Sequence, residues 1–349
     1  MSSYAIGVDL GGTNLRIAAV DEGGKLISKT ALGTEVSRGR EYVVDELCRA
    51  TAEMIREMKE KSSGAELCGI GVGVPGLIDL ESGLLVKSPN LPGWINYDVK
   101  GDIERRLGTA VILENDANVA ALGEQWLGAG RNSESLCMYT LGTGVGGGLI
   151  VDGKLWRGWN GMAGELGHCN VEPEGHPCKC GSHGCLEQYA SATAVVRMAR
   201  EAVVSGVATE LSKLAGNSDR EFNSSVIYEC AIGGDKAAQK VFERVGRALG
   251  LAIGSMVNAM NFPLHVIGGG VSSAWDAFAP AMFNEVRLRS YIYAETTAED
   301  GKGIGGRQHT TVITRAQLGG DGGLYGAARL ALMQWAAKQG ANPAAKQKQ

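Results

Sequence analysis

Two stretches of this chain repeat one plan of strands and glycine turns. Residues 4–30, YAIGVDLGGTNLRIAAVDEGGKLISKT, indicate a strand, a glycine turn, a second strand, another turn and a third strand. Residues 135–158, SLCMYTLGTGVGGGLIVDGKLWRG, follow the same plan with a different sequence. Few folds contain such a meander twice, so the pattern predicts an internally duplicated structure.

The rest of the chain alternates helices with strands. Residues 40–61 place apolar side chains at three- and four-residue steps, which is typical of an amphipathic helix. Further helices are expected from Asp116 onward, over 235–261 and over 321–338, and AVILE and LHVIG indicate buried strands. This alternation predicts the α/β class.

The charge and apolar content of the chain argue against binding to nucleic acid and against crossing a membrane. The chain has 349 residues and a formal net charge of −4, which argues against binding nucleic acid by neutralising phosphates. No apolar run approaches the length of a membrane span. The start, MSSYAIGVDLGG, lacks the basic and apolar regions of a signal peptide, so we expect a cytoplasmic protein.

The two glycine turns have the chemistry of a phosphate site. GTGVGG at 142–147 matches a dinucleotide fingerprint, but a strand follows it where that fold needs a helix, and no P-loop motif occurs. Glycine hairpins can nonetheless present successive backbone N–H groups to an anion. A carboxylate in such a turn would repel phosphate, so Asp9 suggests Mg²⁺, bound directly or through water. The alternative is a pair of ordinary hairpins.

A polar pair ends the strand AVILEN. Asn115 and Asp116 stand where a buried strand gives way to a helix, the edge at which α/β sheets bind ligands. Asp116 could be a general base in phosphoryl transfer, which needs a carboxylate to accept a hydroxyl proton. The alternative is a simple helix cap.

Half of the cysteines lie in one short segment. Cys178, Cys180 and Cys185 have the spacing C-x-C-x₄-C, and two glycines let the loop fold back so that the sulfurs converge. A fourth ligand would complete a tetrahedral zinc site. The candidates are His168, Cys169, His176 and His183.

Within residues 164–191, two glutamates bracket the candidate metal ligands. Glu165 and Glu187 are poor zinc ligands beside thiolates, but they could line a small polar pocket with His168, whose second ring nitrogen remains available. Two carboxylates and one N–H suit the hydroxyls of a sugar. The alternative is a zinc staple with solvated glutamates.

Several motifs together resemble one family. DLGGTN and TLGTGVGGG are similar to the two phosphate motifs of the actin-like ATPase superfold, and VIGGGVS at 266–272 is similar to its adenosine motif. GELGH and CKCGSHGCLE resemble the two signatures of ROK sugar kinases (repressors, open reading frames, kinases). From residue 4 to about 335 the chain resembles this family, and most closely its bacterial ATP-dependent glucokinases.

The resemblance implies a fold and a reaction. Two ribonuclease-H-like lobes would make an α/β, actin-like structure, with residues 1–117 and about 322–340 in a small lobe and 118–321 in a large lobe that carries an inserted zinc loop. The chain would phosphorylate the 6-hydroxyl of glucose with ATP and Mg²⁺, and members of the family are commonly homodimers.

The resemblance also implies residue roles. Asp116 would be the general base. The implied sugar-binding residues are Gly76, Asn90, Asn115, Asp116, Glu165, His168 and Glu187. The implied ATP-binding residues are Asp9, Gly11, Gly12, Thr13, Asn14, Thr140, Gly142, Thr143, Gly144, Gly269 and Gly270. Zinc would bind His168, Cys178, Cys180 and Cys185, and Asp9 would hold magnesium.

Other members of the family set the alternatives. N-acetylmannosamine, N-acetylglucosamine and fructose could occupy the same pocket, since loop shape decides between them. A noncatalytic sugar-sensing repressor needs an N-terminal helix-turn-helix, and the first strand here begins by about Tyr4. We therefore expect a kinase.

Overall fold

The computed structural model describes residues 3–61, 64–206, 210–215, 221–296 and 310–340. The chain divides into two compact units. Unit 1 comprises Met1–Glu134, Gly148–Gly164 and Gln317–Gln349, and unit 2 comprises Ser135–Gly147 and Glu165–Ala316.

Two five-stranded sheets share one topology. The first has the order β3-β2-β1-β4-β8, and the second has the order β11-β10-β9-β12-β13. In the first sheet β1, β2 and β3 form an antiparallel meander, while β4 and β8 add to it in parallel. In the second, β12 pairs in parallel with both β9 and β13, and β10 pairs antiparallel with β11. The predicted duplicated α/β fold is therefore confirmed.

The strand bounds follow the predicted glycine turns. The first sheet contains β1 (Ser3–Leu10), β2 (Asn14–Asp21), β3 (Leu26–Gly33), β4 (Glu66–Val74) and β8 (Val111–Asn115). The second contains β9 (Leu136–Leu141), β10 (Val145–Val151), β11 (Lys154–Leu155), β12 (Leu264–Gly268) and β13 (Val312–Arg315). A small third sheet contains β5 (Leu77–Asp79), β6 (Leu84–Lys87) and β7 (Ile95–Asp98).

The helices of unit 1 are α1 (Arg40–Lys61), α2 (Val99–Leu107), α3 (Asp116–Leu127) and α11 (Gly322–Gly340). Those of unit 2 are α4 (Glu187–Ala190), α5 (Ala192–Val204), α6 (Glu210–Ala215), α7 (Ser224–Ile232), α8 (Lys236–Met260), α9 (Trp275–Arg289) and α10 (Tyr291–Thr296). The two longest, α1 and α8, each bury the apolar stripe that the three- and four-residue spacing of their sequences predicts.

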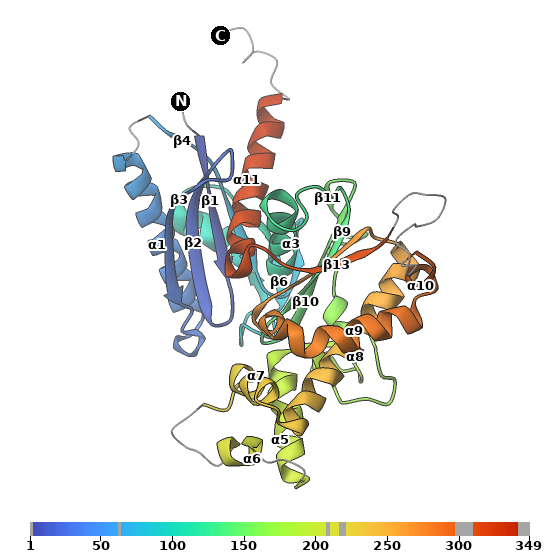
Figure 1. Ribbon diagram of the computed structural model, residues 1–349. Coiled ribbons are helices and arrows are strands. Elements are labelled where there is room, and N and C mark those ends of the chain that lie inside the picture. Colours follow the sequence, from blue (N-terminus) through green and yellow to red (C-terminus); the bar gives the residue numbers. More distant parts are fainter. Residues whose placement is uncertain (1–2, 62–63, 207–209, 216–220, 297–309, 341–349) are drawn as a thin grey trace. The chain divides into compact units, whose positions relative to one another are not determined.

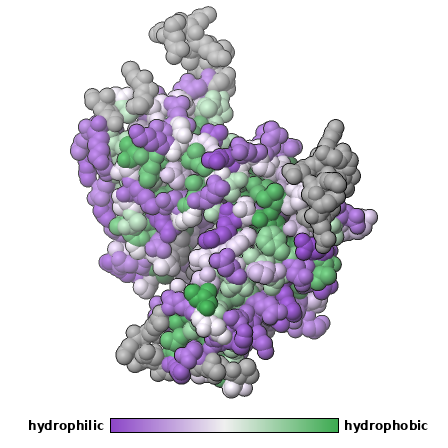
Figure 2. All heavy atoms as spheres, viewed as in Figure 1, coloured by the Kyte–Doolittle hydropathy of each residue, from purple (hydrophilic) through white to green (hydrophobic). Residues whose placement is uncertain are grey.

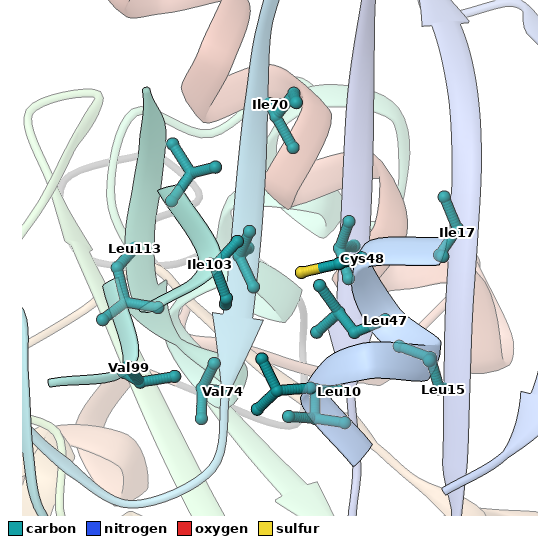
Figure 3. Close-up of a cluster of buried hydrophobic side chains, with 14 of the residues drawn as sticks. Leu10, Leu15, Ile17, Leu47, Cys48, Ile70, Val74, Val99, Ile103 and Leu113 are labelled. Atoms are coloured by element: carbon teal, nitrogen blue, oxygen red, sulfur yellow. The ribbon is translucent and has the colours of Figure 1, made fainter. Parts of the chain in front are cut away.

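One face of the first sheet packs against α1 and α2 to form the main core of unit 1. Leu47 and Cys48 of α1 and Ile103 of α2 meet strand residues such as Leu10 and Val74 there (Figure 3). All five side chains are at most 6% exposed. This core fixes the strands whose ends carry the candidate site.

The other face of this sheet receives α11, from the end of the chain (Figure 1). The approach is close because glycines face it: a Cβ at Gly7 would lie 2.1 Å from the carbonyl oxygen of Leu324. A Cβ at Gly71 would lie 1.9 Å from that of Ala327. Small residues on both elements therefore let the helix backbone lie directly on β1 and β4.

The surface mixes residue types. Figure 2 shows hydrophilic and hydrophobic residues interspersed over the viewed face. Within the described part of the chain, none of the helices combines the length and the apolar character that crossing a membrane requires.

Candidate functional site

Four metal-ligating side chains converge in unit 2. The ligand atoms of His168, Cys178, Cys180 and Cys185 all lie within 4.8 Å of one another. Of the four candidates for the fourth ligand, His168 is the one that joins the three sulfurs. It ends a short 3-10 helix, Leu166–His168, while the cysteines lie on the loop that precedes α4.

The distances fit zinc. The Sγ atoms of Cys180 and Cys185 are 3.7 Å apart, and Nδ1 of His168 is 3.7 Å from Sγ of Cys178. Tetrahedral zinc with Zn–S bonds of about 2.3 Å separates two sulfurs by roughly 3.8 Å. Burial raises the pKa of the Cys185 thiol to about 12, so the thiolate form needs a cation's charge. The cluster is consistent with a zinc site.

The loop that carries the cysteines is folded tightly on itself. The backbone N–H of Cys178 donates to the carbonyl of Ser182 at 2.8 Å, and that of Leu186 donates to Cys169 at 2.9 Å. Nε2 of Gln188 lies 3.5 Å from Sγ of Cys178, close enough to donate to a thiolate. These bonds hold the sulfurs in place around the cluster.

His168 presents its two ring nitrogens to different partners. Nδ1 faces the sulfur of Cys178, and Nε2 lies 3.9 Å from a carboxylate oxygen of Glu165. Burial raises the pKa of Glu165 above its usual value; the charge of Glu187 adds to this rise, while His168 opposes it. The structure thus brings together the predicted imidazole and carboxylates.

Glu187 is bound to the second glycine turn. Its Oε2 accepts a hydrogen bond from the backbone N–H of Val145 at 3.0 Å. A Cβ at Gly144 would lie 2.3 Å from the same oxygen, so any larger residue there would displace the carboxylate or the turn. Ala192 N and Thr193 Oγ1 also donate to the carbonyls of the turn, each at 2.8 Å. One carboxylate therefore joins the segment after the cysteines to the predicted phosphate turn.

The predicted nucleotide residues of unit 2 lie side by side. Gly268 pairs with Thr140 across β12 and β9. Gly269 follows directly, and a Cβ on it would lie 2.4 Å from the carbonyl oxygen of Leu141. The turn residues Gly142, Thr143 and Gly144 and the motif residues Gly269 and Gly270 are thus at the same ends of neighbouring strands.

In unit 1 the site residues gather at the carboxyl ends of β1, β4 and β8. Asp9 pairs with Gly73, and Gly73 pairs with Glu114, so one row of the sheet leads from Asp9 to the residue before Asn115. Asn115 Nδ2 donates to the carbonyl of Gly76 at 3.2 Å. The structure brings these predicted residues to one edge.

The turn that follows Asp9 lies against a predicted sugar residue. A Cβ at Gly12 would lie 3.1 Å from the carbonyl oxygen of Asn90, which stands between β6 and β7. Gly11, Gly12 and Thr13 form the turn, and Asn14 opens β2. The two sets of candidates thus belong to different units, with Asp9, Asn90, Asn115 and Asp116 in unit 1 and the metal cluster and its glutamates in unit 2.

The helix cap is Asn115 rather than Asp116. Oδ1 of Asn115 accepts hydrogen bonds from the backbone N–H groups of Ala117 at 2.9 Å and Asn118 at 3.2 Å. Asp116 is the first residue of α3, and one of its oxygens accepts from Ala117 N at 2.9 Å. Asn115 therefore caps the helix, so capping does not explain why an aspartate stands at position 116.

Asp9 is a largely buried acid at the first glycine turn, with its side chain 16% exposed. Burial raises its pKa to about 6; Arg16, whose Nη1 lies 3.5 Å from Oδ2, opposes this rise, and Asp321 adds to it. A divalent cation would favour the ionised carboxylate, and oxygen is the ligand that Mg²⁺ prefers. The residues present therefore fit magnesium.

Sequence reasoning missed a second buried acid. Glu114 is 1% exposed and forms an ion pair with Arg157, Nε to Oε2 2.7 Å. An acid inside an apolar strand, ILEN, was the available signal, but its partner lies on a distant loop. Gln188 and Thr193 were missed for the same reason, since only the folded structure shows what they contact.

Comparison with known proteins places the chain in a family. The model of the "ROK family" matches residues 5–334. Glucokinase of Thermotoga maritima is 42% identical over 269 residues, which are 77% of this chain and 82% of that protein. A crystal structure of a ROK family glucokinase from Streptomyces griseus in complex with glucose and AMPPNP is 34% identical, with a TM-score of 0.73, and the match covers 95% of this chain and 99% of that one.

Repressors are also similar to it. The xylose repressor of Caldicellulosiruptor bescii is 30% identical, over 82% of this chain and 71% of that protein. Relatives named as kinases and relatives named as repressors are thus both similar to this chain. Since the family model extends over nearly the whole chain, this protein belongs to the ROK family.

Proposed function

We propose that this chain is an ATP-dependent glucokinase that phosphorylates the 6-hydroxyl of glucose. The observation that carries the proposal is the imidazole of His168, which lies between the thiolate cluster and Glu165. Glu187 stands close by and is bound to the glycine turn. This arrangement offers one N–H and two carboxylates to the hydroxyls of a sugar. The glucokinase of S. griseus, which is similar over most of the chain, was crystallised with glucose and an ATP analogue.

In the proposed reaction Asp116 accepts the proton of the sugar O6 hydroxyl. O6 then forms a bond to the γ-phosphorus of ATP, the bond from that phosphorus to the β–γ bridging oxygen breaks, and ADP leaves with the electron pair. The backbone N–H groups of the two glycine turns hold the phosphates. The loss of the proton makes O6 a better nucleophile at the moment of attack.

Two metals would support these residues. His168, Cys178, Cys180 and Cys185 would hold zinc, which would fix the tautomer and orientation of the imidazole. Asp9 would hold Mg²⁺, directly or through water, and the ion would offset the charge of the phosphates. Gly76, Asn90 and Asn115 would complete the binding of the sugar. The resemblance to the family also leads us to propose a homodimer, which light scattering on a size-exclusion column would test.

The decisive experiment is a coupled ADP-release assay over a panel of sugars, with zinc measured on the same sample. The panel contains glucose, N-acetylglucosamine, N-acetylmannosamine, fructose and xylose. We expect the highest kcat/KM with glucose. A higher value with another hexose would replace glucose but keep the kinase, whereas sugar binding without ADP release would favour the regulatory class to which the repressors belong.

Asp116→Asn tests the base. We expect kcat to fall by about 10²–10⁴-fold, because an amide cannot accept the proton. Asp276→Asn, on the exposed first turn of α9, is the matched control and should leave kcat unchanged. Near-normal turnover of Asp116→Asn would contradict its assigned role.

A further inference from the structure

Glu114 is a buried acid that the proposed reaction does not use. It stands one residue before Asn115 and is 1% exposed. Oε1 accepts hydrogen bonds from the backbone N–H of Asn115 and from Nδ2 of Asn118, both at 3.0 Å. A carboxylate at this depth is costly unless a cation and hydrogen bonds compensate it, so its surroundings must be specific.

The compensating cation comes from a distant loop. Nε of Arg157 donates to Oε2 of Glu114 at 2.7 Å, and the two residues are 43 positions apart. The backbone around Arg157 is itself fixed: Trp156 N donates to the carbonyl of Leu149 at 2.8 Å, and Ala163 N donates to that of Arg157 at 3.1 Å. The guanidinium therefore projects from a closed loop of residues 157–163 onto the end of β8.

The carboxylate reaches both sides of the junction between β8 and α3. It holds the backbone of Asn115, whose side chain caps the helix. It also holds the side chain of Asn118, which is 2% exposed one turn into α3. Asp116 lies between these two anchored residues. The direction in which Asp116 leaves the backbone is thus set by a strand, a helix and the loop.

We propose that the Glu114–Arg157 ion pair positions Asp116 for proton transfer, and that residues 157–163 thereby support catalysis without touching the substrate. The role of Asp116 as base rests on the proposed function, whereas the anchoring of the junction does not. Glu114 and Arg157 are both positioning residues, since they act on Asp116 through Asn115 and Asn118. Misplacing a reacting group by about 1 Å can cost up to roughly 100-fold in rate.

Three variants test the pair. Arg157→Gln leaves the buried carboxylate without a cation, and Glu114→Gln leaves the guanidinium facing an amide. For both we expect kcat to fall by about 10- to 100-fold, with KM for ATP nearly unchanged and KM for glucose raised by a smaller factor, because the proposed base and its sugar-binding neighbour Asn115 are both displaced. Arg157→Lys keeps the charge without the planar fork and should recover part of the loss. Arg49→Gln, which removes exposed ion pairs on α1, is the control and should behave as wild type.

Amide hydrogen exchange supplies a readout that needs no activity. Peptides covering residues 111–122 should exchange faster in Arg157→Gln and Glu114→Gln, while peptides covering 40–61 should not change. If Glu114→Gln does not fold, the two Arg157 variants still test the positioning role. The Arg157 side chain is 36% exposed, so replacing it disturbs the core less than replacing Glu114 does. Thermal melting on each sample gives the folded fraction, to which kcat is referred.

The outcomes separate the two proposals. Wild-type kcat per folded molecule in Arg157→Gln, or unchanged exchange over 111–122, overturns the positioning role. A rise in KM with unchanged kcat also overturns it, because substrate binding would then be the affected step. If the wild-type protein releases no ADP with any sugar, the proposed function fails, and the exchange measurement alone decides whether the pair anchors the junction.

Discussion

Glu187 shows how one side chain can serve two parts of a site. Its Oε2 is occupied by the N–H of Val145 in the glycine turn, which leaves Oε1 for another partner. A carboxylate accepts several hydrogen bonds, so structural and binding duties are compatible in a single residue. Under the proposed function, the group that binds the sugar also shapes the turn that holds phosphate.

Gly144 provides a test at this scale. In Gly144→Ala the Cβ would lie 2.3 Å from Oε2 of Glu187, so the carboxylate or the turn must move. We expect the free energy of unfolding to fall by about 1–3 kcal/mol, the usual cost of overpacking. A Cβ at Gly142 would meet nothing within 4 Å, so Gly142→Ala is the control for stability. Urea denaturation measures both, and equal stabilities would contradict the close contact.

At the scale of elements, a metal in the cluster would help to fix the shape of the loop that carries the cysteines. Three sulfurs and one imidazole nitrogen lie within 4.8 Å of one another. Metal binding in such a loop contributes directly to folding. The loop should therefore be the element most sensitive to loss of a ligand.

Cys180→Ser tests the cluster. We expect the metal content to fall from about one zinc per chain and the melting temperature to fall with it, because three ligands hold zinc less tightly than four. Cys169→Ser is the matched control, since Cys169 lies outside the group of four. Elemental analysis and thermal melting measure the two effects. Full zinc occupancy in Cys180→Ser would show that the cluster does not bind as inferred.

The strand β12 contains a histidine that makes stability depend on pH. His265 is 0% exposed and lies between the rings of Tyr139 and Phe262, with both centroid distances 6.3 Å. Among the described residues neither ring nitrogen has a hydrogen-bond partner. Burial lowers the pKa of His265 to about 4. The folded protein thus resists protonation of this ring.

The direction of the pH dependence follows from the pKa of His265 in the unfolded and in the folded chain. The unfolded chain binds a proton as the pH falls through about 6.5, whereas the folded chain does so only near 4. The stability from the neutral ring is therefore complete above pH 6.5 and is lost as the pH falls towards 4, by about 3 kcal/mol. His265→Phe should remove this part of the dependence, which urea denaturation at pH 7 and pH 4.5 would measure. Parallel losses in both proteins would refute the assignment.

Sequence patterns predicted local features better than distant pairs. The three cysteines were recognisable because ligand spacing is read along the chain, whereas spacing left four candidates for the fourth ligand and only the resemblance to the family singled out His168. The α3 boundary at Asp116 was recognisable because a strand pattern and a helix pattern meet there. The cap was less certain, since Asn115 and Asp116 are both good caps and only the hydrogen bonds distinguish them. The partner of Glu114 was not predictable, because nothing in the sequence of residues 156–164 shows what Arg157 contacts.

At the scale of the whole molecule, unit 1 is assembled from three separate stretches of chain. Its sheet has α1 and α2 from the neighbouring sequence on one face, and α11 from the far end of the sequence on the other (Figure 1). The glycines of β1 and β4 make this last contact possible. Unit 1 therefore depends on residues that lie more than 200 positions after its first strands.

Gly71→Ala tests this dependence. A Cβ would lie 1.9 Å from the carbonyl oxygen of Ala327, which forces α11 away from β4. We expect a loss of about 1–3 kcal/mol or more in the free energy of unfolding, with faster amide exchange in α11. Gly23→Ala, whose Cβ would lie at an ordinary 3.4 Å from Asp21 Oδ1, is the control. If α11 exchanged as slowly as in wild type, the docking would not depend on this glycine.

The position of α11 in the sequence also sets an order for biosynthesis. A ribosome releases β1, β2 and β4 early, yet the helix that covers their second face is among the last segments to emerge. The stretch from residue 165 to 316 has by then been translated, so the later-encoded unit can mature while the earlier-encoded one waits with Ala5, Ala18 and Val20 uncovered. For this chain, translation order and the order in which units are completed are reversed, and nascent chains that stall before residue 317 would be natural clients for chaperones.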